Sequence, residues 1–339
     1  MSKSETPPKA VIFGCSGPVL TEEEKRFFRD NNPLGFILFG RNVADPDQVR
    51  ALVADLRGTV GRAAPVLIDQ EGGRVQRLGP PHWRKAPPAA AFASVAARWR
   101  EQGVAAARLN ARLLAEELRD LGIDVDCAPV IDVPVEGAHD IIGDRALGHD
   151  PAMTALLGRA ICDGLLDGGV LPVIKHIPGH GRALADSHLE LPVVKTSAKE
   201  LEETDFVPFR SLADEAWAMT AHVVYSSYDP IRPATLSPTV VRGVIRGAIG
   251  FKGLLLTDDL SMKALSGSFS DRTRQAFFAG CDVALHCNGD PAEMAAVAAA
   301  TPPLSDRSLE RLARGEARRR RPSSLNVAEA YRTLDDWLA

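Results

Sequence analysis

Eight short β-rich segments alternate with longer helical stretches, and this alternation constrains the fold more than any other feature of the chain. Most of the eight are continuously apolar, as is typical of parallel strands covered on both faces. The expected strands are Ala10–Gly14, Gly35–Phe39, Pro65–Asp69, Ile123–Ile131, Leu171–His176, Trp217–Tyr225, Gly253–Asp258 and Val283–Cys287. This order predicts a (β/α)8 TIM-type barrel in the α/β class, with a doubly wound open sheet as the competing architecture.

The segments between the expected strands carry helical patterns. Apolar residues recur three and four positions apart in one of them, and Ser237 before Pro238 is typical of a helix start. The expected helices are Asp47–Leu56, Val104–Leu121, Thr154–Leu166, Ser197–Leu212 and Pro238–Ile249. Because no strong linker interrupts the 339 residues, we expect one catalytic barrel domain over 1–339, with a core at about 10–300 and a helical C-terminal tail.

Composition narrows the class of protein. The formal net charge of −4 gives no electrostatic reason to expect a nucleic-acid partner, and the basic run Arg318–Arg321 is interpreted as a solvated helix end. Five cysteines without a CxxC pair suit a reducing compartment. The N-terminus lacks a signal-peptide pattern, and no apolar run approaches the ~18 residues of a membrane span. We expect a cytoplasmic protein without a membrane partner, and a monomer is favoured.

Polar clusters follow the expected strands, where a barrel carries its active site. The first is DQEGGRVQR, from Asp69 to Arg77, and the second is DIIGDRAL, which contains Arg145. The third is KHIPGHGRALADSH, from Lys175 to His188, and the fourth is TDD, with Asp258 and Asp259. Each cluster alone is compatible with ordinary turns and caps, but four together favour a functional site.

Two kinds of chemistry fit these clusters. His176, His180 and His188 with Asp186 could bind zinc, but the spacing H-x3-H-x7-H matches no established motif, so no metal is predicted. In an extended segment, Asp186 and His188 would point to the same side, and the carboxylate could orient the imidazole for acid/base work. Asp258 could then attack an electrophilic carbon, as a retaining glycosidase requires.

These motifs together resemble glycoside hydrolase family 3. KHIPGHG with DSH, DQEGGRVQR and TDDLSM occur in the family's order, and the resemblance spans roughly Ala10 to Gly289. The chain has no room for the additional domains that carry the acid/base carboxylate of family 3 β-glucosidases. The resemblance therefore favours the branch of bacterial cytoplasmic β-N-acetylglucosaminidases.

The resemblance implies a role for each matching residue. Asp258 is similar to the family's nucleophile, His188 to the general acid/base of this branch, and Asp186 to the residue that tunes it. The positions that match substrate-binding residues are Asp69, Arg77, Arg145, Lys175 and His176. No cofactor and no metal are implied.

Four further residues stay open at this point. Asp259 is expected to be a helix N-cap or to support Asp258. Glu71 is expected to pair with Arg74 or Arg77, and His180 to shape its loop. Arg182 stands where the family often has an acidic residue (GHGDTxxDSH), so loop mobility or aglycone preference could differ.

The activity implied by the resemblance is a retaining exo-β-N-acetylglucosaminidase that acts on a small glycan or muropeptide. Its substrate would be GlcNAc linked to 1,6-anhydro-N-acetylmuramic acid, with or without peptide, in cell-wall recycling. The alternatives are a family 3 β-glucosidase-like exo-hydrolase, a metal-dependent hydrolase and a catalytically silent sugar-binding barrel.

Overall fold

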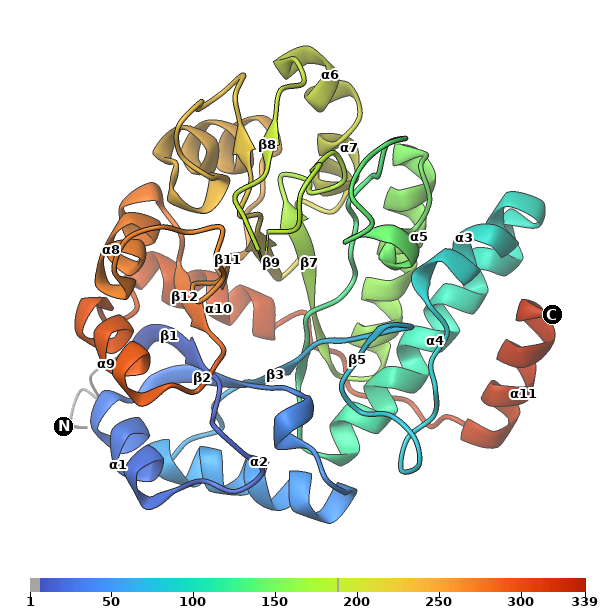
Figure 1. The fold of residues 1–339 in the computed structure, drawn as a ribbon. Helices are drawn as coiled ribbons and strands as arrows, with labels where there is room; N and C mark the ends of the chain where they lie inside the picture. Colours follow the sequence, from blue (N-terminus) through green and yellow to red (C-terminus); the bar gives the residue numbers. More distant parts are fainter. Residues whose placement is uncertain (1–6, 188) are drawn as a thin grey trace.

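Eight parallel strands close into a barrel, which confirms the predicted (β/α)8 fold (Figure 1). The computed structural model describes residues 7–187 and 189–339. Around the barrel the strand order is β1-β12-β11-β9-β7-β6-β3-β2. The barrel strands are β1 (Lys9–Phe13), β2 (Pro33–Leu38), β3 (Val66–Ile68), β6 (Val125–Asp126), β7 (Leu171–Ile177), β9 (Trp217–Thr220), β11 (Leu254–Asp259) and β12 (Val283–His286).

The strand sequences explain how the barrel is packed. Successive side chains of a strand point to opposite faces, so Val11 and Phe13 of β1 join the core under the helices, whereas Ile12 packs in the cluster that fills the barrel interior. That interior cluster also contains Leu171 and Val173 of β7. Both strand faces are therefore buried, which is why these segments are continuously apolar.

The helices surround the barrel in Figure 1, with two exceptions. The helices are α1 (Glu22–Asn31), α2 (Pro46–Val60), α3 (Ala89–Arg98), α4 (Arg100–Asp120), α5 (Pro151–Asp167), α6 (Ala198–Glu203), α7 (Phe206–Ser211), η4 (Thr239–Ala248), α8 (Phe269–Ala279), α9 (Pro291–Ala300), α10 (Asp306–Glu316) and α11 (Val327–Leu338). The exceptions are α10, which lies behind the strands, and α11, which lies outside α4. Short one-turn helices are η1 (Gly40–Asn42), η2 (Gly143–Arg145) and η3 (Ala234–Leu236). Several helices begin with a capping residue followed by proline, as predicted for Ser237 and Pro238. In α5, Asp150 caps the helix and Pro151 is its first residue.

Two predicted elements are divided in the structure. The expected helix Ser197–Leu212 is α6 followed by α7, because Pro208 has no amide to donate to Thr204 and the helix must restart close to it. The expected strand Trp217–Tyr225 ends its barrel part at Thr220. Its last residues form β10 (Val224–Tyr225), which pairs with β8 (Val193–Val194) outside the barrel.

The expected strand Ile123–Ile131 is shorter than predicted, with a regular ladder only at Val125–Asp126. Pro129 has no amide with which to continue the ladder. Val130 forms one isolated bridge to Lys175 beyond it. A small antiparallel hairpin, β4 (Gln70–Gly72) and β5 (Val75–Gln76), follows β3 and carries part of the DQEGGRVQR cluster.

The C-terminal tail crosses the end of the barrel opposite the site. Arg318 pairs with Asp214 and Glu215, Arg319 donates to the carbonyls of Asp124 and Gly169, and Arg320 pairs with two aspartates of α5. The interpretation of this run as a solvated helix end is therefore wrong, because three of its guanidinium groups hold the tail to the barrel. Beyond it, α11 packs against α4 and α3.

No helix in the parts of the chain that the structure describes is both long and apolar enough to cross a membrane.

Candidate active site

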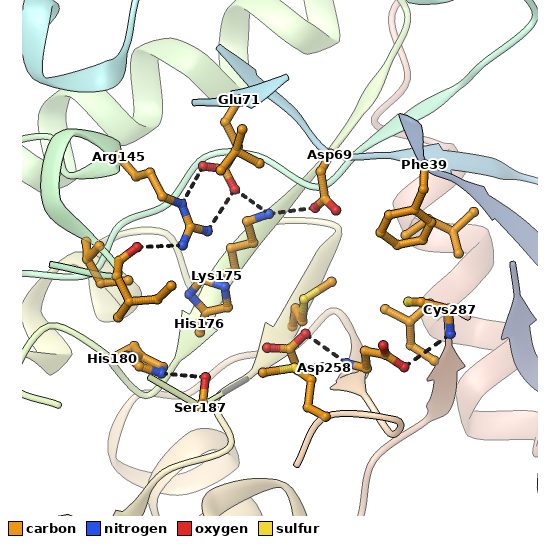
Figure 2. A pocket seen from close by; sticks show the side chains of 18 of the residues that line it. Phe39, Asp69, Glu71, Arg145, Lys175, His176, His180, Ser187, Asp258 and Cys287 are labelled. Carbon is orange, nitrogen blue, oxygen red and sulfur yellow. Dashed lines mark hydrogen bonds and ion pairs between the residues drawn. The ribbon is translucent and has the colours of Figure 1, made fainter. Parts of the chain in front are cut away.

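A cavity of about 450 Å3 lies at the carboxyl ends of the barrel strands, and it contains most of the predicted site residues (Figure 2). The alternation of side chains along each strand, with a period of two residues, explains why these residues face the cavity. Leu67 fills the barrel interior, and two residues later Asp69 faces the cavity. In the same way Val173 precedes Lys175, and Leu256 precedes Asp258. Among the predicted residues, Asp69, Arg77, Arg145, Lys175, His176 and Asp258 line the cavity.

One side of the cavity is a chain of alternating charges, which we call the strand wall (Arg77, Asp69, Lys175, Glu71 and Arg145). Arg77 lies 3.0 Å from Asp69, and the Lys175 ammonium lies 2.8 Å from Asp69 and 2.7 Å from Glu71. Arg145 binds Glu71 through two N–H groups, at 2.8 and 2.9 Å. Figure 2 shows Lys175 between the two carboxylates.

These buried charges keep one another ionised. Burial disfavours the charged form of Asp69, but Lys175 and Arg77 outweigh it and hold the pKa of Asp69 well below its usual range. Burial likewise opposes the charge on Lys175, but Asp69 and Glu71 raise its pKa. The pKa of Glu71 is lowered despite burial, by Lys175 and Arg145. The strand wall is therefore fully charged at neutral pH.

His176 follows Lys175 on β7 and is held from behind by a buried carboxylate. Its ring Nδ1 lies 2.7 Å from Asp132 Oδ2. The peptide bond between Lys175 and His176 is cis. His180 lies nearby, its ring centroid 5.7 Å from that of His176. Burial, reinforced by His176, lowers the pKa of His180 to about 4, so its ring is neutral at physiological pH.

The two aspartates at the end of β11 have different surroundings. Asp258 accepts a hydrogen bond from the amide of Asp259 at 2.8 Å and lines the cavity across from the strand wall (Figure 2). Asp259 accepts from the amides of Ser261 and Cys287 and from the Ser261 hydroxyl. Asp259 is thus not a helix N-cap, since it closes a turn and ties it to the end of β12. The alternative expectation, that it supports Asp258, agrees with this geometry.

The segment that carries Asp186 is not extended, contrary to the expectation. The amides of Leu189 and Glu190 donate to the carbonyl of Asp186, so the backbone turns at this residue. His188, the predicted acid/base, lies outside the described residues. Ser187 lines the cavity, and its hydroxyl lies 3.0 Å from His180 Nε2. We call residues 180–187, whose two ends line the cavity, the loop wall.

The expected pairing of Glu71 is corrected by the structure. Glu71 pairs with Lys175 and Arg145, not with Arg74 or Arg77. Arg74 instead pairs with Asp140 and Asp144 at the rim. The reason is that the β4–β5 hairpin turns Glu71 toward the barrel, while Arg74 sits at the tip of the hairpin, facing the 140–144 loop.

Sequence analysis missed Asp132 and the apolar part of the lining. Asp132 directly follows the apolar APVI segment, the same signal that singled out Asp69 and Asp258, and could have been found in this way. The apolar lining residues are Ile37, Phe39, Val75, Ile141, Ile142, Met219, Met262 and Leu285. Apolar residues of this kind are common in any core, so no sequence signal marks them.

Within residues 7–187 and 189–339, no group of three or more His, Cys, Asp or Glu side chains is arranged to hold a metal ion. The histidines of the loop instead make hydrogen bonds, to Asp132 for His176 and to Ser187 for His180.

Comparison with known proteins identifies the chain. Residues 15–313 match the model of the glycosyl hydrolase family 3 N terminal domain. A "Beta-hexosaminidase" of Aromatoleum aromaticum is 35% identical, over 97% of this chain and 94% of that protein. A protein of the same name from Methylococcus capsulatus is 40% identical, over 82% of each. NagZ from Neisseria gonorrhoeae, solved in complex with N-trifluoroacetyl-D-glucosamine, has a TM-score of 0.88 at 32% identity, covering 98% of this chain and 99% of that one.

Barrel, site and relatives together define a glycoside hydrolase of the β-N-acetylhexosaminidase class. The chain belongs to glycosyl hydrolase family 3, and within that family it is of the NagZ type.

Proposed function

We propose that the protein removes non-reducing terminal GlcNAc from GlcNAc-1,6-anhydroMurNAc, with or without attached peptide, in a retaining two-step reaction. The observation that carries this proposal is that the strand wall and the predicted nucleophile Asp258 face each other across one cavity. Packed side chains such as Ile37 and Leu285 close the floor of this cavity. A closed floor favours entry of a chain end, and hence exo-hydrolysis.

The strand wall has hydrogen-bonding capacity left for sugar hydroxyls. A lysine ammonium has three N–H donors, and the two carboxylates of the wall engage Lys175 at two positions. Each oxygen of Asp69 contacts one cation and retains a second lone pair. Ion-paired, buried side chains lose little freedom on binding, which favours a rigid sugar site. The apolar lining offers a surface for the acetamido methyl group.

The proposed chemistry uses Asp258 and His188. In the first step a carboxylate oxygen of Asp258 bonds to the anomeric carbon, and the bond from that carbon to the leaving oxygen breaks. Protonated His188 gives its proton to this oxygen. In the second step neutral His188 takes a proton from water, the water oxygen bonds to the anomeric carbon, and the ester to Asp258 breaks. Asp186, two residues before His188, would stabilise the imidazolium.

We further propose a cytoplasmic location and a role in cell-wall recycling. All five cysteines are buried and free of disulfides, which suits a reducing compartment. The proposed substrate is a small soluble fragment, and a monomer without a nucleic-acid or membrane partner would suffice to act on it.

Hydrolysis of p-nitrophenyl β-GlcNAc, with EDTA present throughout, tests the proposal. We expect Asp258→Ala to lose on the order of 10^4-fold in kcat, and His188→Ala to lose most turnover on substrates with poor leaving groups. Asp259→Asn is the matched control, because an asparagine oxygen can still accept the Ser261 and Cys287 amides. Preference for p-nitrophenyl β-glucoside would favour the β-glucosidase alternative. Activity that requires zinc would overturn the mechanism, and GlcNAc binding without turnover would indicate a silent barrel.

A further inference from the structure

Asp132 is a fully buried carboxylate that receives three hydrogen bonds from one short segment. Its Oδ1 accepts from the backbone amides of His176, at 3.1 Å, and of His180, at 2.7 Å. Its Oδ2 lies 2.7 Å from the ring Nδ1 of His176. The residue follows the end of β6 and therefore reaches across from the neighbouring strand to β7.

The bond to Oδ2 sets which ring nitrogen of His176 carries the proton. Burial opposes ionisation of Asp132, but the contact with His176 and the hydrogen bond from the His180 backbone amide lower its pKa, so it remains a carboxylate and can only accept. Nδ1 must then be the protonated nitrogen. In the neutral ring this leaves Nε2 as a hydrogen-bond acceptor, on a residue that lines the cavity.

The bonds to Oδ1 fix the start of the loop wall. They hold the amides at both ends of the turn from His176 to His180, in which the Gly179 amide also donates to the His176 carbonyl. The ring of His180 then reaches Ser187, which is 3% exposed and adjacent to Asp186. One carboxylate is thus linked both to the sugar site and to the segment predicted to carry acid/base chemistry.

We propose that Asp132 is a positioning residue for the reaction. It fixes the Nδ1–H tautomer of His176 and the backbone at His180 without contacting substrate, and this role rests on the proposed glycosidase function. Asp132→Asn keeps an oxygen for the two amides but replaces Oδ2 with an NH2 group. That group cannot accept from Nδ1–H, so the ring would switch to the Nε2–H tautomer and turn from acceptor to donor toward the cavity.

The experiment combines kinetics with 15N NMR of histidine-labelled protein, the His176 signals being assigned with His176→Gln. For Asp132→Asn we expect loss of kcat/KM on the order of 100-fold, with the His176 ring shifts exchanged between its two nitrogens. Asp229→Asn is the matched control. Its Oδ1 also accepts two backbone amides, from Ile231 and Arg232, and its Oδ2 accepts from the Ser237 hydroxyl, away from the cavity.

An exchanged tautomer and lost activity in Asp132→Asn alone support the proposal. It is overturned if wild-type His176 carries its proton on Nε2, or if Asp132→Asn keeps both its tautomer and a kcat/KM within threefold of wild type. It is also overturned if both variants lose activity in proportion to lost folded protein. If wild type hydrolyses no β-GlcNAc glycoside, the proposed function fails, whereas the NMR result still decides whether Asp132 positions His176.

Discussion

The strand wall and the loop wall face the same cavity but are held in different ways. In the strand wall, Lys175 is 2% exposed and each of its neighbours is fixed by a charge of opposite sign. In the loop wall, Leu184 is 70% exposed, and Ser187 is fixed by the neutral ring of His180. A buried ion pair is costly to break, whereas one neutral hydrogen bond contributes only about 1 kcal/mol.

This difference matches the tasks that we propose for the two walls. Sugar binding gains from groups held in place before the substrate arrives, because little freedom is then lost on binding. Acid/base chemistry at the leaving group gains from a group that adjusts between two steps. The strand wall has the first property through its buried ion pairs, and the loop wall has the second through the exposure of Leu184 and the neutral hydrogen bond between His180 and Ser187.

The largest effect should come from the centre of the strand wall. Glu71→Gln removes the charge shared by Lys175 and Arg145, and leaves these two buried cations without the carboxylate that pairs with both of them. Removing one member of a buried ion pair costs about 3–5 kcal/mol of unfolding free energy. We expect such a loss in urea unfolding, with kcat/KM on p-nitrophenyl β-GlcNAc reduced on the order of 100-fold because the sugar-binding groups shift.

Asp140→Asn is the control for this prediction. It removes an ion pair of similar length, between Arg74 and Asp140 at 3.0 Å, but at the exposed rim. Exposed pairs are worth about 0–1 kcal/mol. Equal losses in the two variants would mean that burial does not distinguish the strand wall, and the comparison of the two walls would fail.

A loss of folding stability of intermediate size is expected when the pH is lowered. It should begin at a higher pH in the loop wall than in the strand wall. The pKa of His180 is near 4 when folded and near 6.5 in the unfolded chain. The unfolded chain therefore takes up a proton first, so the stability due to neutral His180 is present above pH 6.5 and is lost as the pH falls toward 4. The pKa of Glu71 is depressed, so the stability that its charge contributes is lost only at a lower pH, below the ordinary Glu pKa of 4.5.

Urea unfolding at pH 7 and pH 4.5 measures this effect. Wild type should lose about 1–3 kcal/mol more between these two values than His180→Gln does. His149→Gln, at an exposed position, should behave like wild type. Identical pH dependence in wild type and His180→Gln would mean that the buried ring is not the acid-sensitive part of the loop wall.

The sequence predicted the barrel and the strand ends because both depend on local patterns. Apolar runs bury both faces of each strand, and the period of two then carries Asp69, Lys175 and Asp258 into the cavity. Local patterns do not determine which charges meet. Glu71 and Arg145 are 74 positions apart and come together only through the β4–β5 hairpin and the loop before α5.

Other misses have similar physical causes. The turn at Asp186 depends on amides three and four residues later, which composition does not indicate. The basic run Arg318–Arg321 looks solvated because its acidic partners, such as Asp163 and Asp214, are distant in sequence. Residue types at strand ends were thus predictable, whereas their partners required the fold.

The smallest effect is expected where the loop wall meets the helices outside the barrel. Arg182 pairs with Asp205 at 2.7 Å and with Glu200 at 2.8 Å. Asp205 is almost fully buried, and burial raises its pKa even with Arg182 present. Arg182→Ala should cost about 1 kcal/mol of unfolding free energy, because the partner carboxyl can bind a proton and keeps its bond to Thr204.

Kinetics decide what this contact does for the loop wall. If Arg182 restrains the loop from outside, Arg182→Ala should change kcat by less than about tenfold and leave KM nearly unchanged, because the strand wall is untouched. Lys199→Ala, which removes an exposed pair with Glu203 on α6, is the control and should change neither. A rise in KM with constant kcat would mean that Arg182 supports substrate binding. The division of tasks between the two walls would then be wrong.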